Sequence, residues 1–373
     1  MFTHWIELLQ GRFEALVQRH PILLMVGATV FSILYTGLAV ASDTIYYQLS
    51  LDPFRTRLDL APANYFQETL LQPLCAHALG LKTLTAYSLF CMTLVFCGFA
   101  AFATLVAWRS HRKTAALFLL ILLAHPVRGV LYSFVGMPDA MTFVMTVPFL
   151  FLNAPLALGL LALLAATNHA VFLFIIPTLC LLRWAAHEPG FRWPQLIASI
   201  AGLALGRWVL HGFLMAYGIE LVSRYHCARS LPLVNLVHNN FSQLPMTLFS
   251  LHGAVWVALA ASLAILWSST PRYVLLALAA QTSLYGITFF TSDTTRVFTL
   301  LAWAPALHAV ICANRHVEQS WTPASQGQWQ GALLLVGLAG LLLPMYSVWG
   351  GFVIPCNSLP FYQSILAHIV AAL

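Results

Sequence analysis

The sequence predicts an all-α, polytopic integral membrane protein with about 11 transmembrane helices, because the bilayer needs about 20 apolar residues per upright helix. Several of these helices are expected to be short or broken, and two outer loops are long. A mean hydropathy of +0.83 over 373 residues, with 60% hydrophobic and 8% charged residues, excludes a water-soluble globule. Short polar joints separate the apolar runs. We therefore expect a single transmembrane domain over residues 1–373.

The first twenty residues predict an interfacial amphipathic helix that lies on the membrane surface. Its apolar side chains recur at helical spacing, whereas its charged side chains fall largely outside that stripe. The segment has no apolar core and no small-residue cleavage site, which argues against a cleavable signal peptide. We expect residues 1–20 to stay at the surface and the first span to begin at Pro21.

The expected spans follow the apolar runs 21–41, 83–108, 115–136, 139–153, 155–167, 170–184, 195–217, 249–268, 273–291, 297–313 and 330–349. The fourth to sixth are too short to cross upright, since a segment of about 14 residues covers only about 21 Å. Pro148, Asn153, Pro155 and the pair Asn168–His169 indicate broken helices around a cavity, where irregular backbone is tolerated. The alternative is one long helix over residues 155–184.

The orientation follows from the positive residues beside the spans. With the N-terminus in the cytoplasm, nine Lys and Arg residues fall inside and six outside. This orientation places seven of the eleven acids outside: Asp43, Asp52, Asp59, Glu68, Asp139, Glu220 and Asp293. We expect the inner membrane of a bacterial-type cell, with the active face outward.

Two outer loops, residues 42–82 and 218–248, are long enough to be structured and to cover a cavity at the outer face. Within the first, apolar side chains at helical spacing from Tyr65 to Leu74 predict an amphipathic helix. The second carries Arg224, a candidate substrate ligand. The cytoplasmic joints are short, and no Walker-type glycine loop with its Lys occurs, so the sequence argues against ATP-driven chemistry.

Two acids are candidate catalytic bases. Asp43 lies at the outer end of the first span, where a carboxylate can stand beside a lipid-linked substrate. The alternative is that it caps a helix end or faces water. Asp52 is the second candidate, although Pro53 and the nearby Arg55 and Arg57 are equally typical of a charged turn.

Two arginines are candidate phosphate ligands, since a guanidinium matches phosphate oxygens in bidentate fashion. Arg128 sits beside His125 in an otherwise apolar run, where a buried cation needs a partner or water. The alternative is that it pairs with Asp139 or caps a broken helix. Arg296 follows Asp293 at a polar joint, where Asp293 is expected to cap the next helix or contribute to the substrate site.

Asp139 and His169 complete the candidate substrate contacts. Asp139 follows Pro138, which favours a structural role in the first turn of a helix, with a cavity role as the alternative. His169 stands beside Asn168 in a broken helix and is a candidate hydrogen-bond partner for a sugar hydroxyl. A satisfied buried histidine is the other interpretation.

The chain has 14 His residues, but HExxH and Cys-x-x-Cys are absent from the sequence, so we expect no structural zinc site. The net charge of +6 is explained by basic residues that face anionic membrane lipids, and nucleic acid is not an expected partner.

The outer acid after the first span, the amphipathic first outer loop, the short broken middle helices and the basic outer rim resemble the C-type (GT-C) membrane glycosyltransferases. That resemblance implies transfer of a sugar from a polyprenyl-phosphate donor, with Asp43 or Asp52 at the position of the family's loop acid. The usual adjacent or once-spaced acidic pair is absent here, since Thr44 and Ile45 follow Asp43. The family often employs a divalent cation, magnesium or manganese, and this question stays open.

The expected function is therefore transfer of a sugar from a lipid-linked donor to a hydroxyl acceptor of unidentified class at the outer face. One rival is a transporter or flippase for a lipid-linked or small polar substrate, with Arg128, Arg207 and His169 lining its path, because ionisable residues inside the membrane favour it equally. Another is a non-catalytic subunit whose broken helices pack against a membrane-protein partner.

Overall fold

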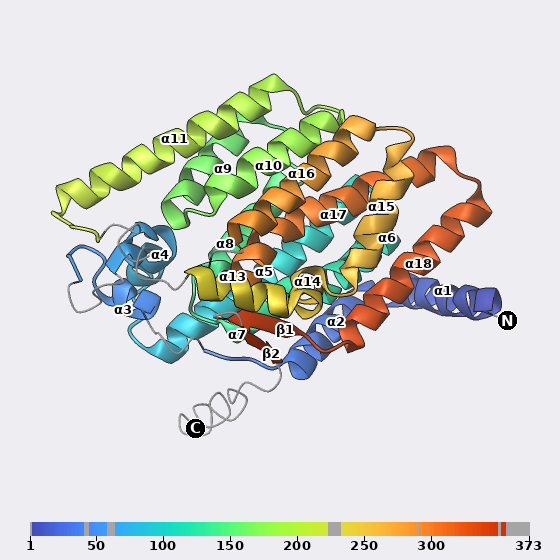
Figure 1. Ribbon diagram of the computed structural model, residues 1–373, viewed down its shortest axis with the longest axis horizontal. Coiled ribbons are helices and arrows are strands. Elements are labelled where there is room, and N and C mark those ends of the chain that lie inside the picture. Colours follow the sequence, from blue (N-terminus) through green and yellow to red (C-terminus); the bar gives the residue numbers. More distant parts are fainter. Residues whose placement is uncertain are drawn as a thin grey trace. The chain divides into compact units, whose positions relative to one another are not determined.

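The computed structural model describes residues 2–40, 45–57, 64–222, 233–288, 291, 293–349 and 352–355. These residues form 17 α-helices, one 3-10 helix and one two-stranded β-hairpin (Figure 1). The predicted all-α class is confirmed for this part of the chain.

Most of the helices follow the apolar runs of the sequence. Their bounds are α1 Phe2–Arg19, α2 Pro21–Thr36, α3 Ile45–Leu51, the 3-10 helix η2 Asn64–Glu68, α4 Leu71–Ala78, α5 Leu84–Arg109, α6 Arg112–Ala124, α7 Val127–Ser133, α8 Asp139–Phe149, α9 Pro155–Asn168, α10 Phe172–Ala185, α11 Trp193–Ala216, α13 Leu233–Ser242, α14 Leu244–His252, α15 Val255–Trp267, α16 Pro271–Thr288, α17 Thr294–Ser320 and α18 Pro323–Leu342. The strands are β1 Tyr346–Trp349 and β2 Phe352–Pro355.

Three helices in the described chain, α5, α11 and α17, are long and apolar enough to cross a membrane. The number rises to six if each of three bent helix pairs counts as one span. This supports a membrane protein, but the predicted count of about 11 spans is not confirmed. One reason lies in the middle of the chain, where α9 and α10 are apolar but only 14 residues long each.

The three bent pairs are α1–α2, α6–α7 and α14–α15, with angles of 112°, 65° and 77°. The first two breaks fall directly before Pro21 and Pro126, because proline pushes the preceding residue out of the helical conformation. The third falls at Gly253, whose φ of +55° favours glycine.

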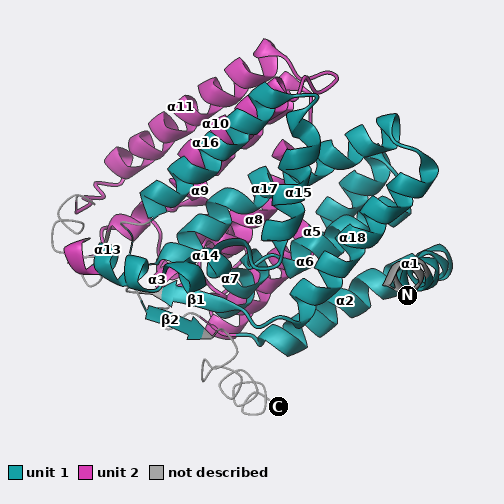
Figure 2. Cartoon of the chain, turned by 45° about the vertical axis from the view of Figure 1, so that its right-hand side comes forward, with its two compact units in different colours: residues 1–38, 99–133, 236–373 teal, residues 39–98, 134–235 magenta. Residues whose placement is uncertain are grey.

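The chain divides into two compact units, each assembled from separate stretches of sequence (Figure 2). Unit 1 contains residues 1–38, 99–133 and 236–373, and unit 2 contains residues 39–98 and 134–235.

In unit 1, α18 packs closely on α6. A Cβ added at Gly340 would lie 2.5 Å from the Cβ of Ala124, so only a glycine allows this approach. The β-hairpin follows α18, and Val348 N–H donates to Thr295 Oγ1 of α17 at 2.8 Å. The sequence predicted a span that continues to residue 349, but the helix α18 ends at Leu342 and the chain then forms the hairpin.

At the N-terminus, α1 coincides with the predicted amphipathic helix over residues 1–20. Phe13 and Val17 are buried, whereas Leu8, Leu9 and Leu16 are exposed. The position of α1 on a membrane surface stays a prediction.

In unit 2, α9 and α11 pack through small residues. A Cβ at Gly202 would lie 2.1 Å from the carbonyl oxygen of Gly159, and one at Gly206 would lie 2.3 Å from that of Leu163. This is the close backbone approach that small-xxx-small patterns allow in membrane helices. The helix α9 ends at Asn168 and α10 begins at Phe172, so the alternative of one helix over 155–184 is wrong.

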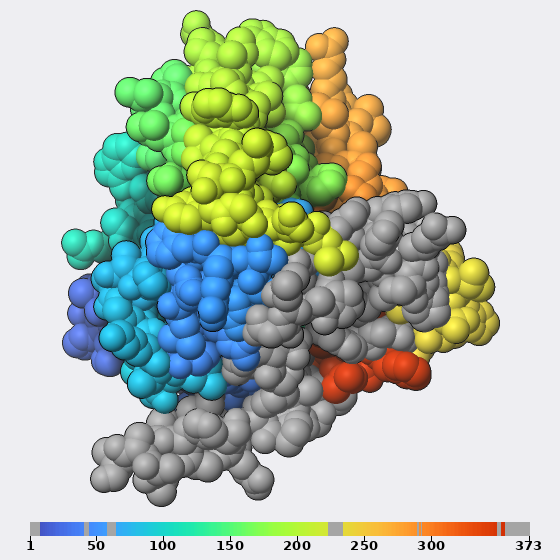
Figure 3. All heavy atoms as spheres, turned by 90° about the vertical axis from the view of Figure 1, so that its left-hand side faces the viewer, coloured from blue at the N-terminus to red at the C-terminus, as the bar shows by residue number. Residues whose placement is uncertain are grey.

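The predicted amphipathic helix in the first outer loop is divided into η2 and α4. The break between them is held by Leu70, whose N–H donates to the carbonyl of Thr167 at 2.9 Å. Pro73 then lies in the first turn of α4, where its missing N–H has no helical partner to lose. The side chains of Leu70 and Leu74 pack with Leu210 and Leu214 of α11. Figure 3 shows this part of the first loop lying against the C-terminal end of α11.

Candidate functional site

Buried polar side chains gather at the start of α8 in unit 2. We call this group the α8 polar centre, and it consists of Gln72, Tyr87, Cys91, Asp139, Thr142, Asn168 and His169. Asp139 is the first residue of α8, follows Pro138 at the N-cap position and is 1% exposed. A carboxylate in the first turn is stabilised by the unpaired N–H groups and the positive end of the helix dipole.

Gln72 makes hydrogen bonds to several elements around the α8 polar centre and is fully buried. Its Nε2 donates to Tyr87 Oη at 2.9 Å and to the carbonyl of Met137 at 2.9 Å. Its Oε1 accepts from the N–H of Met141 at 3.3 Å. A buried polar atom needs a hydrogen-bond partner. The partners of the Gln72 amide lie on α5 and at the start of α8, so this one side chain joins α4 to both. Sequence reasoning missed Gln72, and its only signal was an amide within an apolar helical run.

Thr142 lies close to two of the sequence-predicted site residues of unit 2, Asp139 and His169. It stands one helical turn after Asp139 and therefore shares its face of α8. Its Oγ1 accepts from Asn168 Nδ2 at 3.2 Å and lies 3.2 Å from His169 Nδ1. Asp139 and His169, both predicted as substrate contacts, thus belong to the same centre.

An ion pair between Glu68 and Arg207 lies at the edge of this region. Arg207 Nη2 is 3.4 Å from Glu68 Oε2, and the side chains are 33% and 19% exposed, respectively. The segment after Glu68 carries both Leu70, which bonds Thr167, and Gln72, whose N–H donates to Asn168 Oδ1 at 3.2 Å. The pair is therefore tied through one short segment to the α8 polar centre.

The chain that leads to Asp43 runs beside the chain that leads to Asp139. Val40 and Val135 form a parallel β-bridge, and Val135 N–H donates to the carbonyl of Ala39 at 2.9 Å. Asp43 itself lies outside the described residues.

Asp52, the second candidate base, forms a local turn. Its Oδ1 accepts from the N–H of Phe54 at 3.3 Å, and its Oδ2 lies 2.9 Å from Arg55 Nε. The Asp52 side chain is 40% exposed. This geometry matches the charged turn that the sequence offered as the alternative. Arg224 lies outside the described residues.

Arg128, in unit 1, contacts the C-terminal end of α18. Its guanidinium is fully buried and donates from Nη2 to the carbonyls of Gly340 and Leu341, both at 3.2 Å, and from Nε to Met345 Sδ at 3.3 Å. A cation at this point stabilises the unpaired carbonyls and the negative end of the helix dipole. These contacts match capping of a helix end, and the phosphate contact stays a prediction.

Asp293 and Arg296 form an ion pair of 2.9 Å at the start of α17. Asp293 occupies the N-cap position, as predicted, but its side chain makes no cap hydrogen bond. Both side chains are mostly buried, at 10% and 13% exposed. Their predicted roles in substrate binding stay predictions.

Two buried histidines of unit 1 form a contact that sequence reasoning missed. His125 Nε2 and His252 Nδ1 are 2.7 Å apart, and both side chains are fully buried. His252 Nε2 lies 3.2 Å from Gln281 Oε1. Each histidine stands next to a helix break, but pairing across 127 residues is not visible in a single sequence.

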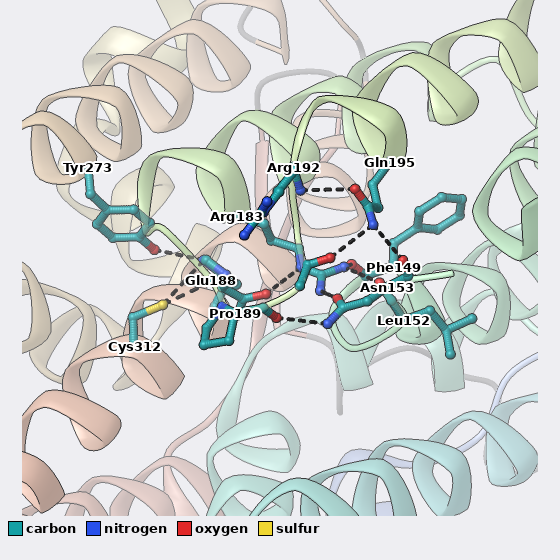
Figure 4. A network of polar contacts seen from close by, with 12 residues as sticks. Phe149, Leu152, Asn153, Arg183, Glu188, Pro189, Arg192, Gln195, Tyr273 and Cys312 are labelled. Carbon is teal, nitrogen blue, oxygen red and sulfur yellow. Dashed lines mark hydrogen bonds and ion pairs between the residues drawn. The ribbon is translucent and has the colours of Figure 1, made fainter. Parts of the chain in front are cut away.

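Arg183 is the most heavily bonded arginine described in unit 2 (Figure 4). Its Nε lies 2.6 Å from Glu188 Oε2, and its Nη1 donates to the carbonyls of Phe149 and Leu152 at 2.8 and 2.7 Å. Its Nη2 donates to Asn153 Oδ1 at 2.5 Å. All three guanidinium nitrogens are used, so this network holds the ends of α8 and α10 together.

The α8 polar centre contains one carboxylate among the described residues, Asp139. One carboxylate supplies too few hard oxygen ligands to define a magnesium or manganese site. The question of a divalent cation therefore stays open.

No family model, no curated protein and no solved structure matches this chain.

Proposed function

We propose that this protein is a membrane glycosyltransferase that moves a sugar from a polyprenyl-phosphate donor to a hydroxyl acceptor at the outer face, with its chemistry at the α8 polar centre. The observation that carries the proposal is the buried carboxylate of Asp139 on α8, one helical turn before Thr142, whose Oγ1 contacts both Asn168 and His169. A buried carboxylate among neutral donors and acceptors suits recognition of sugar hydroxyls.

The reaction requires a base for the acceptor and positive charge near the departing phosphate. The acceptor hydroxyl gives its proton to a carboxylate, its oxygen bonds to the anomeric carbon, and the carbon–oxygen bond to phosphate breaks. The electron pair of that bond leaves on the phosphate oxygen. Asp43 remains the candidate base.

In this mechanism the other members of the α8 polar centre orient the donor sugar. His169 is partly exposed and Thr142 is fully buried, so His169 is the member that a sugar reaches first. Gln72 bonds α4, α5 and the start of α8 to one another, and rigid support of this kind keeps the groups that contact the substrate aligned.

The test is turnover of radiolabelled polyprenyl-phosphate sugars by purified protein, with donor binding measured in parallel. Asp43→Asn is expected to lower transfer by about 10²–10⁴-fold while donor binding survives. Asp139→Asn removes a proposed contact to the donor sugar and should weaken donor binding as well as transfer. Asp52→Asn is the matched control, because it removes a carboxylate from an exposed turn of the same unit and should change transfer little. Donor binding without transfer by the wild type would redirect the assignment to a flippase or an accessory subunit.

One observation favours a transporter as the second candidate. Three helix pairs are bent by more than 40°, and broken helices near a substrate site are characteristic of secondary transporters. Uptake of the labelled lipid across proteoliposomes, measured with the same variants, separates the two functions.

A further inference from the structure

The Glu68–Arg207 pair has the features of an anion site. Arg207 is the single Asp, Glu, Lys or Arg residue in the 24 residues of α11, a helix apolar enough to span a membrane. An arginine in such a helix is costly unless it has a partner or a task. Its contact with Glu68, at 3.4 Å, is long for a charge-assisted hydrogen bond.

The guanidinium also has unused donor capacity. Arg207 Nη1 is buried, and among the described residues it has no hydrogen-bond acceptor. A buried donor without an acceptor costs about 1–3 kcal/mol. Phosphate oxygens match two guanidinium nitrogens at once, so an incoming phosphate can satisfy both Nη1 and Nη2.

The backbone around Arg207 is firmly held. Gly206 abuts Leu163 of α9, and Leu210, one turn after Arg207, packs with Leu70. Both contacts fix the rotation of α11, and a site on a rigid element positions its ligand well.

The surroundings indicate how the phosphate arrives. Leu205, Trp208 and Val209, which flank Arg207 on α11, are 46%, 72% and 41% exposed. Arg207 therefore stands at the border between the packed face of α11 and an open apolar face. A phosphate attached to a hydrocarbon chain matches both features, whereas free phosphate uses only the cation.

We propose that Arg207 binds the phosphate of a lipid and that Glu68 is the counterion that this phosphate displaces. The proposal rests on the proposed function only for the identity of the lipid as the polyprenyl donor. The carboxylate of Glu68 repels the same phosphate, so the two residues should act in opposite directions.

The experiment measures binding of polyprenyl phosphate to the full chain in nanodiscs of zwitterionic lipid, with native mass spectrometry as the readout. Arg207→Gln should weaken binding by about 10- to 100-fold, which corresponds to loss of a charged hydrogen bond. Glu68→Gln should tighten binding, because it removes the competing carboxylate. Arg207→Lys keeps the charge but loses bidentate geometry and should give an intermediate affinity.

Arg55→Gln is the matched control, since Arg55 belongs to the same unit and its side chain is 68% exposed. It removes one positive charge and should leave binding unchanged. If Arg207→Gln and Arg207→Lys both bind polyprenyl phosphate as the wild type does, the proposal is wrong. Unchanged or weaker binding in Glu68→Gln overturns the counterion role.

Further arms identify the source of the phosphate. Inorganic phosphate should bind much more weakly than polyprenyl phosphate, and equal affinity would contradict a lipid ligand. Phosphatidylglycerol that competes equally would establish a general anionic-lipid site and overturn the assignment to the donor. Because binding is measured without turnover, loss of binding in Arg207→Gln supports this site even if the wild type transfers no sugar.

Discussion

His125 and His252 are hydrogen-bonded at 2.7 Å, and each stands at the break of a bent helix pair. The N–H of Val127 donates to His125 Nδ1 at 3.1 Å, so His125 carries its proton on Nε2 and donates to His252 Nδ1. His252 then donates from Nε2 to Gln281 Oε1. The direction of every bond follows from one backbone N–H, and both imidazoles are neutral in this arrangement.

This chain of bonds predicts that single substitutions cost more than the double substitution. His252→Leu leaves the Nε2–H of His125 buried without an acceptor, which should lower the free energy of unfolding by about 1–3 kcal/mol. The double variant His125→Leu/His252→Leu removes both partners and should be more stable than the sum of the single effects predicts. Thermal unfolding of the four proteins gives the coupling energy, and strict additivity would contradict the predicted bond.

Removing one partner of the Arg183–Glu188 pair should be strongly destabilising. Glu188→Gln leaves a buried guanidinium without its counterion, and breaking a buried pair typically costs about 3–5 kcal/mol. Arg183→Met removes the donor to Phe149, Leu152 and Asn153 and should be at least as harmful. Melting temperatures in detergent test both variants, with Arg55→Gln as the exposed control; a melting temperature like that of the wild type in Glu188→Gln would exclude a structural role for the pair.

Any side chain at Gly202 should destabilise the contact between α9 and α11. A Cβ there overlaps the carbonyl oxygen of Gly159, so Gly202→Ala forces the two helices apart. Gly212 lies on the same helix with no atom within 4 Å of its added Cβ. Gly212→Ala should therefore be neutral or stabilising by up to about 1 kcal/mol. Thermal unfolding of both variants tests this prediction. Equal melting temperatures for Gly202→Ala and Gly212→Ala would contradict it.

Cys75 of α4 should react slowly with thiol reagents. Burial raises the pKa of its thiol, because desolvation disfavours the thiolate. The thiolate is the reactive form, so at pH 7.5 maleimide labelling should be slower than that of free cysteine. The rate should rise about tenfold per pH unit up to the raised pKa. Labelling of the wild type minus that of Cys75→Ser gives this rate, and labelling as fast as that of free cysteine would show an accessible, unshifted thiol.

In the second half of the chain, the predicted borders agree best for α11 and α16, whereas the predicted span 249–268 is broken between α14 and α15 and the predicted span 330–349 is displaced from α18, Pro323–Leu342. The predicted span over 273–291 corresponds to α16, Pro271–Thr288. The hairpin after α18 was missed because Tyr346–Trp349 is mostly apolar and follows the apolar run of α18 after three residues. Periodicity alone cannot separate a short buried strand from the end of a helix.

The candidate site was predictable residue by residue but not as a group. Asp139 and His169 stood out as polar residues in apolar surroundings, yet the contact of His169 with Thr142, one turn after Asp139 on α8, depends on how α8 and the end of α9 pack. Gln72 and Arg207 show the same limit, since their partners lie 69 and 139 residues away. Asp43 remains a prediction from sequence.

Unit 1 is assembled from distant stretches of sequence, so some of its contacts can form only late in synthesis. Arg128 is made 212 residues before Gly340, whose carbonyl accepts its hydrogen bond. At about 5–20 residues per second, the ribosome needs about 10–40 s to make that partner. All of unit 2 has been translated by residue 235. The hydrogen bonds from Arg128 to the carbonyls of Gly340 and Leu341 can therefore form only after α18 has been made, so α18 completes unit 1 at the end of biogenesis.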